Sequence, residues 1–148
     1  MKIREINSHE VYNLLECLST LAEYHNKVSL YFKGRFPNQP YEKTLTSFCQ
    51  FLNDGISKIA IIESVEKIIG FCKIDFIKNT GKLDYLIVLP EYRGNGYGKL
   101  LMDWAMKEFA NQKCVHIEVK VIAGNETIHL YEKYGFKVKS HILQYDGQ

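Results

Sequence analysis

The chain has 148 residues, of which 46% are hydrophobic and 24% are charged, and its formal net charge is +2 at pH 7. This is the composition of a globular protein, and it excludes a disordered or fibrous chain. The charge is too small, and the lysines are too scattered, to indicate a nucleic-acid partner. The length predicts that residues 1–148 form a single domain with one core.

The first forty residues predict a strand, a long helix and a surface loop. Apolar and polar residues alternate from Lys2 to Ile6, as they do in a strand. Asn7 and Glu10 then stand at the spacing of a capping box, before a run of leucines at helical spacing. The segment from Lys27 to Pro40 is aromatic and basic, which indicates a loop over the surface.

A second helix and a hairpin are expected next. Pro40 is well placed near the start of a helix, and Asn-Asp-Gly at residues 53–55 ends the helical pattern. Residues 58–63 and 68–77 are β-branched and aromatic runs separated by Glu66 and Lys67. They predict two strands joined by a turn.

The C-terminal half alternates between strand-like and helix-like patterns. We expect strands over residues 83–89 and 115–121, helices over residues 100–110 and from residue 125, and closing strands over residues 136–139 and 141–145. The full order is then β-α-α-β-β-β-α-β-α-β-β. It predicts an α/β fold in which a mixed sheet has helices on both faces.

Neither a metal site nor a membrane partner is expected. The four cysteines, at positions 17, 49, 72 and 114, lie far apart, with no Cys-x-x-Cys pair and no histidine at zinc-finger spacing. The N-terminus has no apolar signal core, and no run approaches the roughly eighteen apolar residues that cross a bilayer. We therefore expect a cytoplasmic protein.

The sequence Arg-Gly-Asn-Gly-Tyr-Gly at residues 93–98 is the most informative local pattern in the chain. It lies between a predicted strand and a predicted helix. Glycines let the main chain approach a ligand, and the first turn of a helix offers unpaired N–H groups. Such a junction stabilises an anion with main-chain groups alone, so we expect a phosphate site here.

The spacing excludes two common phosphate loops. A dinucleotide fold has the pattern Gly-x-Gly-x-x-Gly, but here the third glycine, Gly98, comes one residue early. A nucleoside-triphosphate loop needs Ser or Thr after Gly-Lys, but Gly98 and Lys99 are followed by Leu100. Asn95-Gly96 is also a hairpin signal, but the helical period that follows disfavours a hairpin.

The run from Leu86 to Leu101 resembles the acetyl-CoA-binding motif of the GCN5-related N-acetyltransferases. That motif reads Gln or Arg, two residues, Gly, one residue, then Gly or Ala, and Arg93, Gly96 and Gly98 satisfy it. Residues 125–136, which read Asn-Glu-Thr-Ile-His-Leu-Tyr-Glu-Lys-Tyr-Gly-Phe, resemble the second signature of the same family. The resemblance covers the C-terminal half, and the N-terminal half matches it only in layout.

The resemblance implies the fold of this family, a central, mostly antiparallel, twisted sheet of about six to seven strands with helices on both faces. It implies an enzyme that transfers an acetyl group from acetyl-CoA to a primary amine of a small molecule or peptide, by direct attack in a ternary complex. Two alternatives stay open: a non-catalytic sensor of CoA or acyl-CoA, and a transferase that uses another acyl-CoA. Exposed strand edges would also allow a homodimer.

The resemblance also assigns cofactor-binding residues. The turn implied to wrap the pyrophosphate comprises Arg93, Gly94, Asn95, Gly96, Tyr97, Gly98 and Lys99, with the charge of Arg93 added. Leu86, Ile87 and Val88 are implied to pair with the pantetheine arm, although a purely structural strand would have the same residues. Asn125 is implied to touch the cofactor, and it is also an ordinary residue at a helix N-cap.

Tyr131 occupies the family position whose hydroxyl donates a proton to the sulfur of CoA. A phenol suits this role, because a general acid must combine reach with a matched acidity. The alternative is a core tyrosine on an amphipathic helix.

Asp84 interrupts an apolar strand and matches a position where several relatives carry Glu, so it is the predicted general base. Alternation would place it on one face with Leu86 and Val88. A carboxylate is a poor base at neutral pH unless burial favours its protonated form, and an Asp bonded to the main chain at a strand start is the structural alternative. The rival is a water relay to a residue of the acceptor side, namely Tyr24, His25 or Tyr31.

The acceptor is expected to contact the first two helices and the loop between them. This segment is basic, with Lys27, Lys33, Arg35 and Lys43 against only Glu42. That excess hints at an acceptor that carries phosphate or carboxylate as well as its amine. Such residues on an exposed loop are more often simply solvated.

Overall fold

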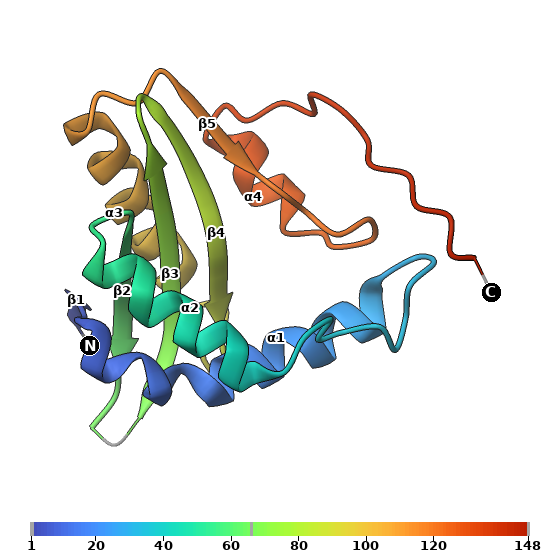
Figure 1. Ribbon diagram of the computed structural model, residues 1–148, viewed down its shortest axis with the longest axis horizontal. Helices are drawn as coiled ribbons and strands as arrows, with labels where there is room; N and C mark the ends of the chain where they lie inside the picture. The colour runs from blue at the N-terminus through green and yellow to red at the C-terminus, as the bar shows by residue number, and fades with distance from the viewer. Residues whose placement is uncertain (1, 66, 148) are drawn as a thin grey trace.

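A mixed five-stranded sheet forms the centre of the protein (Figure 1). The computed structural model describes residues 2–65 and 67–147. The strands are β1 (Lys2–Glu5), β2 (Ser57–Glu63), β3 (Ile68–Ile77), β4 (Thr80–Val88) and β5 (His116–Val119), and the α-helices are α1 (Leu15–Val28), α2 (Tyr41–Asn53), α3 (Tyr97–Asn111) and α4 (Ile128–Lys133). The strands lie in the order β1-β2-β3-β4-β5, and all pairs are antiparallel except β4 and β5, which are parallel.

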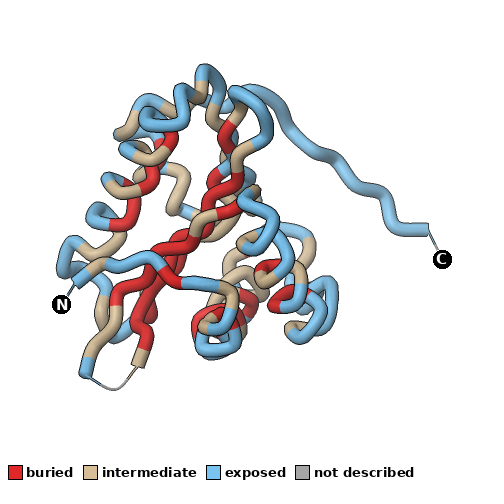
Figure 2. Tube along the Cα trace, turned by 60° about the vertical axis from the view of Figure 1, so that its left-hand side comes forward, coloured by how far each residue is buried: buried red, intermediate tan, exposed pale blue. Residues whose placement is uncertain are grey.

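Helices cover both faces of this sheet (Figure 1). On one face, α1 and α2 pack side chains such as Leu18 against Phe71. On the other face, α3 packs side chains such as Phe109 against Ile74. Because both faces are covered, β2 and β3 are buried along most of their length (Figure 2) and have apolar runs instead of a strict alternation.

Most elements expected from the sequence are confirmed. β2 and β3 pair as the expected hairpin, although Glu66 in the turn lies outside the described residues. α2 follows Pro40 directly, and its end is followed by Gly55 with a φ of +75°. The first helix is divided, because a 3₁₀ helix, Ser8–Leu14, precedes α1. Asn7 caps that 3₁₀ helix by accepting from the N–H of His9.

The two closing strands expected over residues 136–139 and 141–145 are wrong, because this segment forms no strand. A strand needs a partner for its main-chain hydrogen bonds as well as a suitable pattern. After Phe136, which packs against Tyr131, residues 137–147 instead run away from the sheet as an exposed tail (Figures 1 and 2). Leu143 and Tyr145 are 90% and 92% exposed, so the alternation of this tail is not used for burial.

Gly124 brings the loop after β5 against the end of α1, where the N–H of Leu30 donates to the carbonyl of Ala123 at 3.1 Å. Gly124 has a φ of +101°, and a Cβ atom there would overlap the main-chain oxygen of Val28.

We expect Gly124→Ala to lower the free energy of unfolding by about 3 kcal/mol, because the cost of the strained φ and the cost of the clash with the backbone add together. Gly34→Ala is the control, since Gly34 has a φ of +82° in open space. It should cost about 1 kcal/mol. Equal losses in urea titrations would argue against this contact.

Candidate functional site

The parallel strands β4 and β5 separate at the edge of the sheet (Figure 1). Their ladder ends at Leu83 and Val119, but β4 continues to Val88. On this side, residues 84–88 therefore have no strand partner within the described chain. Apart from the carbonyl of Val88, which accepts from Arg93 Nε, their outward main-chain N–H and C=O groups are available to a ligand.

β4 leads through a 3₁₀ helix, Pro90–Tyr92, into the glycine turn at the start of α3. Gly94 and Gly96 have φ values of +82° and +83°, a region that glycine adopts without strain. Gly96 is the N-cap of α3 and provides no side-chain hydrogen bond. The N–H groups of the first turn therefore stay open to an anion, at the positive end of the helix dipole. Gly98, in contrast, lies inside α3.

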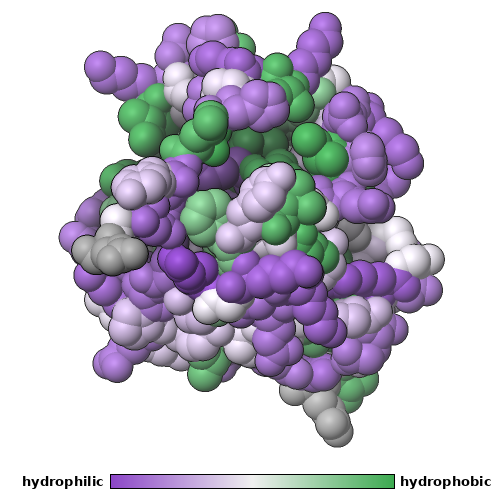
Figure 3. Space-filling model, turned by 90° about the vertical axis from the view of Figure 1, so that its right-hand side faces the viewer, coloured by the Kyte–Doolittle hydropathy of each residue, from purple (hydrophilic) through white to green (hydrophobic). Residues whose placement is uncertain are grey.

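The turn and the open part of β4 line a cavity of about 770 Å³. Most of the predicted site residues line it, namely Tyr24, His25, Asp84, Leu86, Ile87, Val88, Arg93, Gly94, Gly96, Tyr97, Gly98, Asn125 and Tyr131. In Figure 3 this side of the molecule is hollowed, with hydrophobic side chains near its centre and hydrophilic ones around them. Asn95 and Lys99 lie in the same turn without lining the cavity, and Tyr31 is 83% exposed outside it.

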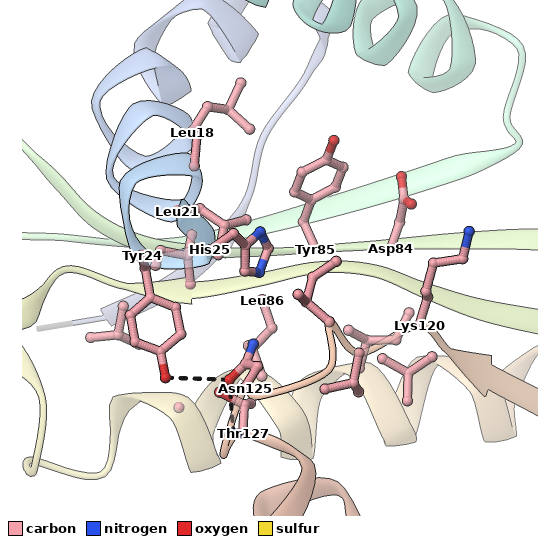
Figure 4. A pocket seen from close by; sticks show the side chains of 18 of the residues that line it. Leu18, Leu21, Tyr24, His25, Asp84, Tyr85, Leu86, Lys120, Asn125 and Thr127 are labelled. Carbon is pink, nitrogen blue, oxygen red and sulfur yellow. Dashed lines mark hydrogen bonds between the residues drawn. The ribbon is translucent and has the colours of Figure 1, made fainter. Parts of the chain in front are cut away.

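Tyr24 of α1 connects the glycine turn to the loop before α4 (Figure 4). Its hydroxyl donates to Asn125 Oδ1 at 3.3 Å, and the same oxygen accepts from the N–H of Thr127 at 2.9 Å. The Arg93 guanidinium lies over the Tyr24 ring, 5.1 Å from its centroid, and Arg93 Nε donates to the carbonyl of Val88 at 2.9 Å. These contacts hold the charge of Arg93 at the edge of the cavity.

Tyr131 reaches the cavity from α4, where it packs edge-on against Phe136 with ring centroids 5.9 Å apart. The residue is only 6% exposed. Burial raises the pKa of Tyr131, because an apolar environment disfavours the phenolate. The hydroxyl is therefore protonated at neutral pH and can act as a proton donor.

Asp84 lies at a β-bulge, and the face expected for it is wrong. Leu83 and Tyr85 pair with consecutive residues of β3, so Asp84 is an extra residue between them. Its side chain points to the same side as that of Tyr85 and away from Leu86 (Figure 4). Strict alternation would have placed it with Leu86 and Val88, but one extra residue reverses the face.

Behind Asp84 lies a buried ion cluster that the sequence interpretation missed. Lys73 Nζ donates to Asp84 Oδ2 at 2.6 Å and to Asp75 Oδ1 at 2.7 Å, with only 1% of its side chain exposed. Ser57 donates to the same Asp75 oxygen at 2.6 Å. On the open side, Lys82 Nζ lies 3.4 Å from Asp84 Oδ1. The available signal was a Lys and an Asp two residues apart in an otherwise apolar strand.

Aromatic rings of α2 complete the environment of this cluster. Lys73 Nζ lies 5.1 Å from the ring centroid of Phe48 and 5.6 Å from that of Phe51. A buried ammonium requires such partners, because it has lost its water. Beside the cluster, burial raises the pKa of Tyr85 to about 12, so this phenol also stays protonated.

His25 of α1 lines the cavity and packs against Phe36, with ring centroids 5.3 Å apart. Burial lowers the pKa of His25, because it disfavours the imidazolium. The ring is therefore uncharged at neutral pH, and one ring nitrogen can accept a proton.

Two kinds of feature are not found in residues 2–65 and 67–147. No three or more His, Cys, Asp or Glu side chains gather there in a way that could hold a metal ion. No helix of this described part is long and apolar enough to cross a membrane.

Comparison with known proteins adds a family match. A family model described as "Acetyltransferase (GNAT) domain" matches residues 55–138, which contain the open strand, the glycine turn and Tyr131. Spermidine N(1)-acetyltransferase of Vibrio cholerae is 20% identical over 137 residues, which are 88% of this chain and 77% of that protein. Two further curated relatives are matched over only 52% and 53% of their own lengths.

Solved structures share the fold. A tetramutant protein from Bacillus halodurans superposes with a TM-score of 0.80 and 19% identity, over 99% of each chain. PaiA N-acetyltransferase from Thermoplasma acidophilum, in complex with coenzyme A, superposes with a TM-score of 0.76 and 20% identity, over 95% of this chain and 92% of that one. The mixed α/β architecture expected from the sequence is therefore confirmed, but the described chain has five strands in its sheet and not the expected six to seven, because the two closing strands do not form.

The buried ion cluster makes a prediction about stability. Lys73→Met should lower the free energy of unfolding by about 3 kcal/mol, because it leaves the buried Asp75 carboxylate without its cation and removes one of the two cations beside Asp84. Adding Asp75→Asn should recover part of the loss. Lys58→Met is the control, since Lys58 forms a more exposed ion pair with Glu108 at 3.2 Å. It should cost less than about 1 kcal/mol. If Lys73→Met unfolds in urea at the same concentration as the unmodified chain, the cluster does not stabilise the fold.

Proposed function

We propose that this chain, which belongs to the GNAT acetyltransferase family, transfers an acetyl group from acetyl-CoA to a primary amine of a small molecule or peptide. The observation that supports this most strongly is the junction where β4 leaves β5 and enters the glycine turn of α3. Unpaired strand groups, an open helix N-terminus and a buried phenol all face one cavity there.

The glycine turn is the proposed pyrophosphate site. Main-chain N–H groups from Gly94 to Lys99 would donate to the phosphate oxygens, and Arg93 would add a positive charge. Leu86, Ile87 and Val88 would pair through their main chain with the pantetheine arm. Asn125, whose side chain is already fixed by Tyr24, would position the arm from the opposite wall. The cavity volume of about 770 Å³ is suited to such a ligand.

The proposed reaction is a direct attack in a ternary complex. The amine nitrogen bonds to the acetyl carbon while the carbon–sulfur bond breaks, so no acyl-enzyme forms. N–H groups of the open strand polarise the acetyl carbonyl, as preorganised donors do in other acyl transfers. Tyr131 donates its proton to the leaving sulfur and regains one from the solvent, and the proton that the amine loses passes to the general base and from there to the solvent.

Asp84 remains the proposed base, acting on the acceptor amine directly or through one water. Its position at the cavity edge supports this role, although its two oxygens already contact Lys73 and Lys82. The second candidate is His25, which burial keeps uncharged and which lines the same cavity. Tyr24 is engaged with Asn125, and Tyr31 is exposed and does not line the cavity, which disfavours a direct role for either.

The decisive experiment mixes the protein with acetyl-CoA and a panel of amines and measures free thiol. Thiol release that depends on the amine supports an acetyltransferase. Binding of acetyl-CoA in calorimetry without turnover would instead support the sensor alternative. Parallel assays with propionyl- and succinyl-CoA test the choice of acyl group, and sedimentation tests the predicted homodimer. The cytoplasmic location stays a prediction of the sequence.

Tyr131→Phe tests the proton donor. We expect kcat to fall by about a hundredfold, because the leaving thiolate loses its acid, while the affinity for CoA is unchanged. Calorimetry and initial rates measure the two quantities. An unchanged kcat would remove the hydroxyl from the mechanism.

Gly96→Asp tests the pyrophosphate site. The new carboxylate would repel the phosphates and strain a residue whose φ is +83°, so CoA binding should be lost. Gly55→Asp is a matched control, since Gly55 has a φ of +75° in open space at the end of α2. It should have similar strain and retain CoA binding. Retained binding in Gly96→Asp would refute the assignment of the turn.

A further inference from the structure

We propose that the acceptor carries an anionic group, a carboxylate or a phosphate, close to its primary amine, and that Lys82 and Lys120 bind this group. The inference rests on the proposed acetyl transfer and specifies which amines are used.

Lys82 lies on β4, in the last part of the ladder, and Lys120 directly follows Val119, the last residue of β5. The last paired position of β4 and β5 is Leu83 with Val119, so Asp84 of β4 and Lys120, the residue after β5, come next where the ladder opens. Lys82, Asp84 and Lys120 all line the cavity. In Figure 4 the Lys120 side chain extends along the same end of the cavity as Asp84, away from Asn125 and Thr127.

The charge at this end is positive. Lys82 and Lys120 face one carboxylate, that of Asp84, which the buried Lys73 already contacts at 2.6 Å. The other acidic residue of the lining, Glu126, adjoins Asn125 at the opposite end. At this end of the cavity Lys82 and Lys120 can therefore contact an anion, whereas the one carboxylate of the lining there, that of Asp84, is already paired with Lys73.

This arrangement disfavours a polyamine. A polycation would bring additional ammonium groups against Lys82 and Lys120, and like charges at close range are repulsive. An amine with a neighbouring anion has the complementary pattern. Lys82 is free to turn toward that anion, because its side chain is 51% exposed and its contact with Asp84 is 3.4 Å long. The acceptor amine then takes the place of Lys82 beside Asp84.

The test compares acceptors that differ only in the anion. Amino acids including β-alanine are assayed beside their amides, O-phosphoethanolamine beside ethanolamine, and spermidine as the polycation, with thiol release as the readout. We expect kcat/KM of the anionic member of a pair to exceed that of its neutral counterpart by about tenfold or more. The carboxylate and phosphate arms identify which anion is preferred.

Variants then locate the effect. Lys120→Met should raise KM for the anionic acceptor by about tenfold and leave KM for the neutral counterpart unchanged. Lys82→Met, which also removes a contact of Asp84, should raise KM for the anionic acceptor by about tenfold more than KM for the neutral one. Lys120→Arg should retain most of the preference, because it keeps the charge. Lys107→Met, an exposed lysine of α3 outside the cavity lining, is the control and should change neither KM.

The outcomes separate this inference from the function on which it rests. Equal turnover of charged and neutral acceptors, or a preference for spermidine, overturns the inference and leaves acetyl transfer intact. Lysine variants that affect both members of a pair equally also overturn the inference alone. Binding of acetyl-CoA without turnover of any amine overturns both the inference and the enzyme proposal.

Discussion

The opening between β4 and β5 is the feature on which the site depends. If their parallel ladder continued past Leu83 and Val119, the main-chain N–H and C=O groups of residues 84–88 would all be hydrogen-bonded to neighbouring strands. The cavity would then be filled by the sheet. The strand instead carries free main-chain groups to the glycine turn, and the start of α3 adds its own unpaired N–H groups at the end of the same path.

The bulge at Asp84 and the buried Lys73 act together to place and neutralise one carboxylate. The bulge turns Asp84 toward the face that α2 covers, where an isolated carboxylate would be costly. Lys73 supplies the compensating charge at 2.6 Å and also donates to Asp75, whose same oxygen accepts from the hydroxyl of Ser57. A shift of β4 by one residue would remove Asp84 from Lys73 and leave the ammonium with one carboxylate. The ion cluster thus favours this register over its neighbours, which is the use of buried charge that is best supported in proteins.

Features with a local signature could be predicted from the sequence. The glycine run before a helical period predicts the turn at the start of α3, and the Asn-Asp-Gly sequence predicts the end of α2. The bulge could not be predicted, because an extra residue in β4 is defined only by its pairing with β3. The prediction of the closing strands was wrong for a related reason. Alternation in residues 136–145 indicates that this segment could form a strand, but a strand also needs a neighbouring strand for its main-chain hydrogen bonds. Tyr31 resembled a site residue only by its place in the aromatic loop, whereas Tyr24, one helical turn inside α1, is the tyrosine that reaches Asn125.

The positions of the charged residues around the cavity say more about the ligands than the net charge of the chain does. The formal net charge of +2 predicts no particular partner. The cavity nevertheless has Arg93 at one end and Lys82 and Lys120 at the other, with Asp84 held between two ammonium groups. The glycine turn can bind a diphosphate with several main-chain N–H groups in a row. The ammonium groups of the side chains at the opposite end do not form such a row of donors. In the two proposals, one anionic ligand binds at each end of the cavity, and the open strand between them is the place where an amine and a thioester would meet.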